Sequence, residues 1–147
     1  MLPLPIFWPP VTTALIRRVG VYGRCIRDGA ILLTLLAATE PDRGRWTLPG
    51  GGMEFGETPH EALAREFREE TGLRPDIGRL VTARSHMFPP DERRGPLHSV
   101  QFVYEVAAAG APSVVEVGGS TADVAWVPLD QVGRLPLVDL ARWAVSR

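Results

Sequence analysis

Three glutamates in residues 64–72, AREFREETG, have the residue type and spacing of a divalent-metal site. On a helix, Glu66 and Glu70 lie one turn apart and stack on the same side, with Glu69 beside them. Two unit charges about 6 Å apart repel by roughly 3 kcal/mol at an effective dielectric of about 20. A hard cation, Mg²⁺ or Mn²⁺, would remove that cost. The alternative, a solvated face neutralised by arginines, stays open from spacing alone.

Residues 58–71 are predicted to form the helix that carries these glutamates. Thr58 has the residue type of an N-cap, and Glu61, three residues later, completes a capping box. Pro59 occupies the first helical position, where proline is favoured. Gly72 comes directly after the last periodic residue, as expected of a left-handed C-cap. The helix should therefore begin and end close to these residues.

The apolar residues of this helix indicate which side is buried. Leu63 lies on the same arc as Glu66 and Glu70, and Phe67 borders it. We therefore expect these carboxylates at the edge of the core, where repulsion costs more than on the surface. Arg65 points elsewhere, and it is expected to pair with Glu61, four residues earlier.

Three consecutive glycines, Gly50, Gly51 and Gly52, precede the helix. Without side chains they let the backbone approach a ligand closely, and their carbonyl oxygens can face a cation. A tight strand turn is the alternative explanation. Taken alone, the glycines favour the turn, but next to the acidic helix they add to the case for a metal site.

Together, residues 51–73, GGMEFGETPHEALAREFREETGL, resemble the signature of the Nudix hydrolases. That signature is a glycine, five residues, a glutamate, seven residues, then Arg-Glu-apolar-any-Glu-Glu-any-Gly-apolar, and it is matched without departure. The flanking LPGGG and AWVPLDQV are also similar to the family. The resemblance implies an α/β fold, an α/β/α sandwich around a mixed sheet, and hydrolysis of a diphosphate bond in a nucleoside diphosphate linked to a further group.

The resemblance also implies roles for individual residues. Glu66, Glu69 and Glu70 would bind the metal, with Glu66 also orienting or deprotonating the attacking water. Glu57 would lie near the site and Arg65 would support the glutamates from behind. The carbonyl of Gly51 would complete the metal's ligands, and Mg²⁺ or Mn²⁺ would be the cofactor.

A further acid from outside the signature is expected, because some family members recruit one. Glu105 is the first candidate, since alternation in residues 98–106 places it on the more polar face of a strand. Asp91 and Glu92, in a Pro-rich loop, are rival candidates. Ordinary surface charge is the alternative for all three.

The substrate is less well indicated than the reaction. We favour a nucleoside triphosphate with a normal or damaged base. The alternatives are ADP-ribose or another nucleotide sugar, and a non-catalytic nucleotide-sensing domain on the same fold. Substrate contacts are predicted at Gly50, Gly51, Gly52, Phe88 and Tyr104. Tyr22 could also stack a base, whereas Trp46 and Trp126 are expected in the core.

The composition of the 147 residues limits the class of protein. A hydrophobic content of 45% suits one domain, and a net charge of -1 without long charge runs argues against nucleic acid as a partner. One cysteine and no lysine exclude an internal disulfide and Schiff-base chemistry. We expect a cytoplasmic protein with neither signal peptide nor membrane span, and with a small nucleotide as its partner. A homodimer is an open alternative.

The chain is predicted to consist of a Pro-rich arm, residues 1–18, and a Nudix hydrolase domain, residues 19–147. Residues 1–10 would form an extended, polyproline-like segment. Within the domain, residues 19–26 and 30–38 are expected to form an antiparallel hairpin around Asp28 and Gly29. The other predicted strands cover residues 46–55, 77–85, 98–106, 114–117 and 124–129, and a final helix covers residues 136–145.

Overall fold

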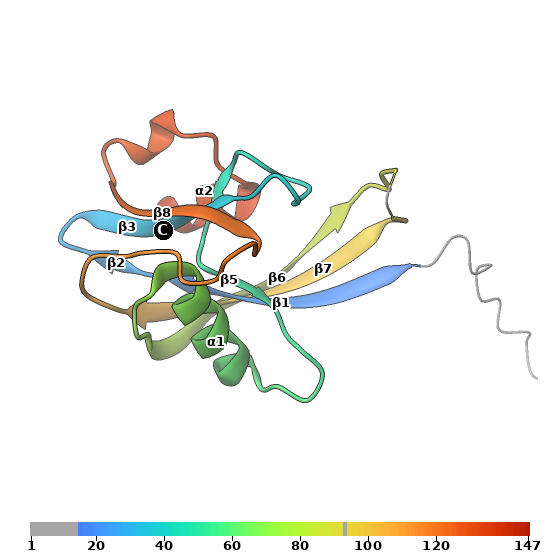
Figure 1. Ribbon diagram of the computed structural model, residues 1–147, viewed down its shortest axis with the longest axis horizontal. Helices are drawn as coiled ribbons and strands as arrows, with labels where there is room; N and C mark the ends of the chain where they lie inside the picture. The colour runs from blue at the N-terminus through green and yellow to red at the C-terminus, as the bar shows by residue number, and fades with distance from the viewer. Residues whose placement is uncertain (1–14, 93) are drawn as a thin grey trace, which may run out of the picture.

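The computed structural model describes residues 15–92 and 94–147, and their strands form two four-stranded sheets (Figure 1). The first sheet has the order β5-β1-β7-β6, and its strands are β1 (Ile16–Arg24), β5 (Gly50–Gly52), β6 (Asp76–Phe88) and β7 (Leu97–Ala107). β1 and β7 are parallel and the other neighbours are antiparallel, so this sheet is mixed. The second sheet is antiparallel, and its strands are β2 (Ile26–Arg27), β3 (Ala30–Leu36), β4 (Trp46–Thr47) and β8 (Thr121–Pro128).

The first sheet separates two layers, which confirms the predicted sandwich. In Figure 1, helix α1 (Pro59–Thr71) lies on one side of it, and helix α2 (Asp139–Val145) lies on the other with the second sheet. Side chains of β7 alternate accordingly: Phe102 and Tyr104 pack with the core beneath α1, and Val103 packs with the core beneath α2. A short 3₁₀ helix, η2 (Val132–Arg134), precedes α2.

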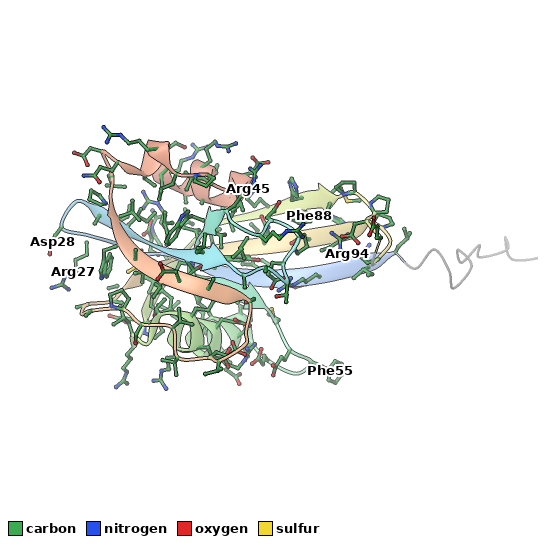
Figure 2. All side chains as sticks on the ribbon, turned by 45° about the horizontal axis from the view of Figure 1, so that its top comes forward. Arg27, Asp28, Arg45, Phe55, Phe88 and Arg94 are labelled. Atoms are coloured by element: carbon green, nitrogen blue, oxygen red, sulfur yellow. The ribbon has the colours of Figure 1, made fainter. Side chains whose placement is uncertain are left out.

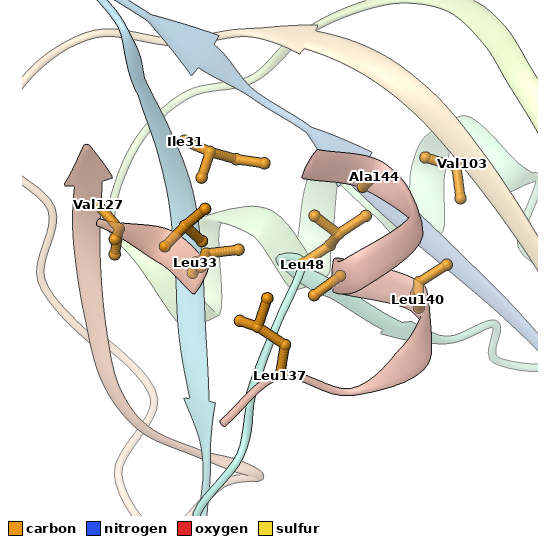
Figure 3. Packing of buried hydrophobic residues seen from close by; sticks show 10 residues of the cluster. Ile31, Leu33, Leu48, Val103, Val127, Leu137, Leu140 and Ala144 are labelled. Carbon is orange, nitrogen blue, oxygen red and sulfur yellow. The ribbon is translucent and has the colours of Figure 1, made fainter. Parts of the chain in front are cut away.

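Two hydrophobic clusters fix these layers. The cluster beneath α2 joins β3, β7, β8 and α2, and Figure 3 shows Leu48 at its centre beside Leu140. The last helix is shorter than predicted, because α2 begins at Asp139 and not at residue 136. The residues expected on its inward side are buried nonetheless: Leu140, Ala141 and Ala144 on the helix, and Leu137 just before it. The cluster beneath α1 surrounds Phe67 and also contains Leu63, and both side chains are fully buried.

Helix α1 begins and ends as its sequence predicts. The hydroxyl of Thr58 accepts a hydrogen bond from the backbone N–H of Glu61 at 3.2 Å. At the other end, Gly72 has a left-handed φ of 69°, and its N–H donates to the carbonyl of Arg68. The caps fix the register of the helix, and therefore which of its side chains face β5.

The predicted hairpin of residues 19–26 and 30–38 is only partly correct. Asp28 and Gly29 do form its turn, with positive φ angles of 50° and 75°. However, only the two residues of β2 pair with β3. β1 ends at Arg24 and pairs instead with β5 and β7 in the other sheet. The chain passes from one sheet to the other at the fully buried Cys25. The predicted strand of residues 19–26 is therefore divided between the two sheets.

Two further strand predictions are wrong. Residues 46–55 form two short strands in different sheets, β4 and β5, separated by Leu48 and Pro49. Residues 114–117 form no strand. Instead, the N–H groups of Val115 and Glu116 both donate to the carbonyl of Glu69. The segment is thus held against the end of α1 by backbone hydrogen bonds; Val114 packs against the core beneath α1, whereas Val115 and Val117 are exposed.

The predicted arm lies mostly outside the described residues. Regular structure begins at Ile16, three residues before the predicted boundary at Val19. Among the described residues, none of the helices has the length and apolar character needed to cross a membrane.

Candidate functional site

Glu70 of α1 is the most deeply buried carboxylate of the predicted site. It is 3% exposed. The backbone N–H of Gly50 donates to its Oε2 at 2.7 Å, and the hydroxyl of Thr121 on β8 donates to its Oε1 at 2.9 Å. Glu70 is thus held between β5 and β8, at the point where the two sheets meet α1.

The environment of Glu70 disfavours its negative charge. Burial raises the pKa of this carboxyl to about 8, and the nearby charge of Glu66 contributes. The hydrogen bonds from Gly50 and Thr121 oppose this rise without cancelling it. A cation next to Glu70 would supply the missing compensation.

Arg65 links the other acids of the helix and its preceding loop. It donates twice to Glu57, at 2.6 and 2.9 Å, and once to Glu66 at 2.9 Å. Its guanidinium also lies 3.6 Å from a carboxylate oxygen of Glu69. The expected pair with Glu61 is therefore wrong: the arginine turns along the helix toward Glu57, where three acids can share its charge.

The same contacts have opposite effects on different carboxylates. The bidentate bond from Arg65 lowers the pKa of Glu57 to about 2. Burial raises the pKa of Glu66 in spite of Arg65, and it also raises that of Glu69, to which the charge of Glu66 adds. Burial, with smaller contributions from neighbouring acids, thus raises three pKa values on one face of α1, and Arg65 does not compensate for it.

This donor set fits a hard divalent cation. Glu66, Glu69 and Glu70 offer only oxygen ligands, which Mg²⁺ and Mn²⁺ prefer. Across residues 15–92 and 94–147, no three acidic, histidine or cysteine side chains already converge on one point. Arg65 lies between Glu66 and Glu69, so a cation bound by those two carboxylates would compete with its guanidinium.

The glycines of β5 are required by close packing. Gly50 has a φ of 147°, and a Cβ there would lie 2.1 Å from the carbonyl oxygen of Val21. A Cβ on Gly51 would lie 2.8 Å from the carboxyl carbon of Glu66. The backbone of β5 therefore lies directly against the carboxylates of α1. Gly52 contributes its carbonyl, which accepts a hydrogen bond from Arg65 at 3.2 Å.

A cavity of about 360 Å³ opens from these carboxylates. Glu66, Glu70, Gly50 and Gly51 line it at the α1 and β5 side. Residues of β1, β6 and β7 line much of the rest, together with the loop between β3 and β4 and the start of α2. Phe88 near the end of β6 and Arg45 before β4 also line it, and both are labelled in Figure 2. Further polar and aromatic residues of the lining include Arg18, Tyr22, Thr47, Arg84, Ser99 and Gln101.

Several predicted site residues lie outside this cavity lining. Glu105 is on the predicted face of β7, but at its far end, where it forms a 2.8 Å ion pair with Arg24 beside the end of α2. Tyr104 is on the opposite face and packs edge-on against His60 of α1, with ring centroids 5.1 Å apart. Strand alternation alone could not tell which stretch of the polar face borders the site.

The two rival acids are not part of the lining either. Asp91 accepts a hydrogen bond from the backbone N–H of Arg94 within its own loop, and Glu92 is exposed next to it. Trp46 and Trp126 are partly buried against the two cores, as expected.

Some residues of the site carry no sequence signal of their own. Thr121 is a single threonine at the start of a strand, and only the fold brings it to Glu70. Glu116 is a further acid whose charge raises the pKa values of Glu66 and Glu69. Glu116 belongs to residues 114–117, which were predicted as a strand, so the proximity of Glu116 to α1 could not be inferred from the sequence.

The family comparison agrees with this geometry. The sequence model of the NUDIX domain matches residues 14–146. The chain belongs to the Nudix family. The match begins two residues before β1 and ends in the last residues after α2.

Individual relatives support the same assignment. A nucleoside triphosphatase, NudI, of an Enterobacter species is 34% identical over 125 residues, which are 78% of this chain and 84% of the relative. An ADP-ribose pyrophosphatase of Methanocaldococcus jannaschii is 40% identical over 88 residues, 60% of this chain but only 50% of the relative. The match thus spans about half of that relative.

A solved structure reproduces the fold. The crystal structure of a MutT NUDIX hydrolase from Burkholderia pseudomallei superposes with a TM-score of 0.75 at 31% identity. The match covers 88% of this chain and 96% of that chain.

Proposed function

We propose that this Nudix protein hydrolyses a diphosphate bond in a nucleoside diphosphate linked to a further group, with nucleoside triphosphates as preferred substrates. One observation carries the proposal: Glu66 and Glu70 line the same cavity as the polar residues Ser99 and Gln101. A negatively charged cation site and a space suited to the rest of a nucleotide therefore adjoin each other.

The proposed cofactor is Mg²⁺ or Mn²⁺, bound by Glu66, Glu69 and Glu70 and by the carbonyl of Gly51. When bound, such an ion neutralises phosphate charge and lowers the pKa of a coordinated water. Fixed charges in a site shielded from bulk water stabilise charge that develops at phosphorus. The three carboxylates on this face of α1 support the assignment.

The chain's own residues have distinct tasks in this proposal. Glu66 orients the attacking water and accepts its proton, which its raised pKa favours. Arg65 fixes the carboxylates of Glu57 and Glu66 relative to β5. Gly50 and Gly51 let β5 pack directly against its neighbours, because a side chain at Gly50 would clash with Val21 and one at Gly51 with the carboxylate of Glu66.

ADP-ribose, or another nucleotide sugar, is the second candidate substrate. It is favoured by the 40% identity to a protein named ADP-ribose pyrophosphatase. The 34% identity to a protein named nucleoside triphosphatase covers more of both chains, which is why we place triphosphates first.

The direct test is a substrate panel with Mg²⁺ or Mn²⁺. Nucleoside triphosphates, ADP-ribose, dinucleoside polyphosphates and nucleotide sugars are incubated with the full chain, and products are separated by chromatography. We expect a triphosphate to give a nucleoside monophosphate and pyrophosphate at the highest kcat/KM. Preference for ADP-ribose would support the second candidate, and no turnover with any compound would overturn the hydrolase in favour of a nucleotide-sensing domain.

A homodimer is proposed as the assembly to be tested with the same preparation. Mass in solution is compared for the full chain and for a variant without residues 1–10. A dimer that the deletion converts to monomer would assign the contact to the arm, whereas an unchanged dimer would assign it to the domain.

A further inference from the structure

Two buried polar side chains of β7 face the cavity without a partner in the protein. Ser99 is 3% exposed and Gln101 is 7% exposed, and both line the cavity. In the part of the chain that the structure describes, neither side chain takes part in a hydrogen bond. Because both side chains line the cavity, their donors and acceptors are available to a molecule bound there.

The chemistry of Gln101 indicates the kind of molecule. Its amide presents one donor and one acceptor side by side, the pattern that pairs with the edge of a nucleobase. The hydroxyl of Ser99, two residues along the same face, both donates and accepts. Each can therefore match a base edge in more than one arrangement.

An aromatic surface lies next to this amide. Gly20 of β1 is directly opposite Gln101 in the parallel pairing. A Cβ on Gly20 would lie 2.8 Å from the ring of Tyr22, so the ring of Tyr22 folds over this glycine. Tyr22 also lines the cavity. A planar base that bonds to Gln101 would thus have an aromatic ring beside it, which favours stacking.

The carboxylates and the amide are placed for the two parts of one nucleotide. Glu66 and Glu70 line the same cavity from α1, and Gln101 lines it from the strand two positions away from β5 in the first sheet. Arg84 and His86 pair with Gln101 and Ser99 across β6 and β7, and Arg84 reaches toward the ring of Trp143 at 5.9 Å. Gln101 remains free for a ligand.

We propose that Gln101, with Ser99, binds the edge of the substrate's nucleobase and so favours nucleotides over polyphosphates that have no base. This rests on the proposed function and goes beyond it. Because no described protein group fixes which way round the amide lies, it accepts either order of donor and acceptor. The protein should therefore act on nucleotides with several different bases, and far less well on a polyphosphate that has no base.

The test compares Gln101→Met, Gln101→Glu and the wild type on ATP, GTP, CTP, UTP and inorganic tripolyphosphate. Methionine keeps the size of glutamine and removes both polar groups, so kcat/KM for nucleotides should fall about 5- to 150-fold and that for tripolyphosphate should not change. The ionised carboxylate of Gln101→Glu only accepts, so it should favour guanine, which offers adjacent N–H donors, over adenine. Gln131→Met, at an exposed glutamine, is the control and should match the wild type.

A uniform fall for every compound, tripolyphosphate included, or unchanged kcat/KM with every base, would overturn this assignment. Calorimetric titration with nucleoside monophosphates separates it from the proposed function. If the wild type turned over nothing, the hydrolase would be refuted. A weaker Kd for Gln101→Met than for Gln131→Met would still support base binding, and equal Kd values would refute it.

Discussion

Replacing Thr121 with valine should weaken metal binding without touching α1 or β5. Valine resembles threonine in shape but lacks the hydroxyl that donates to Oε1 of Glu70 at 2.9 Å. A hydrogen bond to a charged group contributes about 1.5 to 3 kcal/mol. Since it stabilises the ionised carboxylate, its loss should raise the pKa of Glu70 further above its value of about 8.

The size of the effect follows from this pKa. One unit corresponds to about 1.4 kcal/mol, so the lost bond raises the pKa of Glu70 by about one to two units. At pH 7 a cation must displace the proton from Glu70, and the half-saturating Mg²⁺ concentration should rise about 10- to 100-fold. The difference should shrink as the pH rises past both pKa values, because the carboxylate then becomes ionised in either protein.

Two measurements test this reasoning. Hydrolysis is titrated with Mg²⁺ at pH 7 and at alkaline pH, and the metal-dependent rise of Tm is recorded as a readout independent of activity. Thr121→Ser keeps the hydroxyl and should resemble the wild type. The reasoning is refuted if valine and wild type have the same half-saturating concentration at pH 7, or if their difference grows as pH rises.

Three further predictions concern the helix, β5 and the core. Glu70→Gln should lower kcat by roughly two orders of magnitude or more in a steady-state assay, because a metal ligand is lost at constant shape. The control Glu61→Gln, on the exposed first turn, should keep wild-type activity. If Glu70→Gln also kept nearly wild-type activity, Glu70 would not belong to the metal site. Gly51→Ala places a Cβ 2.8 Å from the carboxyl carbon of Glu66, so kcat should fall about 10- to 100-fold. Gly133→Ala, with nothing within 4 Å, should keep full activity, and equal rates for both variants would contradict the close approach. Burial raises the pKa of Cys25 from 9.0 to about 11, so iodoacetamide should alkylate this thiol slowly at pH 8. The contribution of the neutral thiol to the free energy of unfolding should be fully present below pH 9 and decline as the pH rises toward 11. A urea midpoint that stayed constant over this range would refute the raised pKa.

The sequence by itself determined the parts of the protein that depend on local spacing. The caps at Thr58 and Gly72 specify where α1 begins and ends, because each satisfies backbone groups within a few residues. The spacing of Leu63 and Phe67 against Glu66 and Glu70 then specifies which side of the helix is buried. Most fixed positions of the Nudix signature lie in this segment, which is why the family could be recognised before the fold was known.

Strand pairing was decided only by the tertiary structure. Residues 19–24 have the same alternation whether they pair with their neighbour or with a distant strand, and β1 pairs with β7, about 80 residues away. Residues 114–117 have a strand-like composition, yet they bond through their backbone to Glu69 of α1, and Val115 and Val117 stay exposed. A local apolar pattern therefore specifies neither the pairing partner of a segment nor whether the segment is buried.

The same limit applies to the site. Glu105 and Gln101 share one face of β7, so alternation treats them alike. In the fold, four residues along a strand separate the ion pair with Arg24 from the cavity. Thr121 reaches Glu70 from 51 positions away. Such contacts depend on how two sheets meet at one helix, and no local interaction in the sequence specifies that junction.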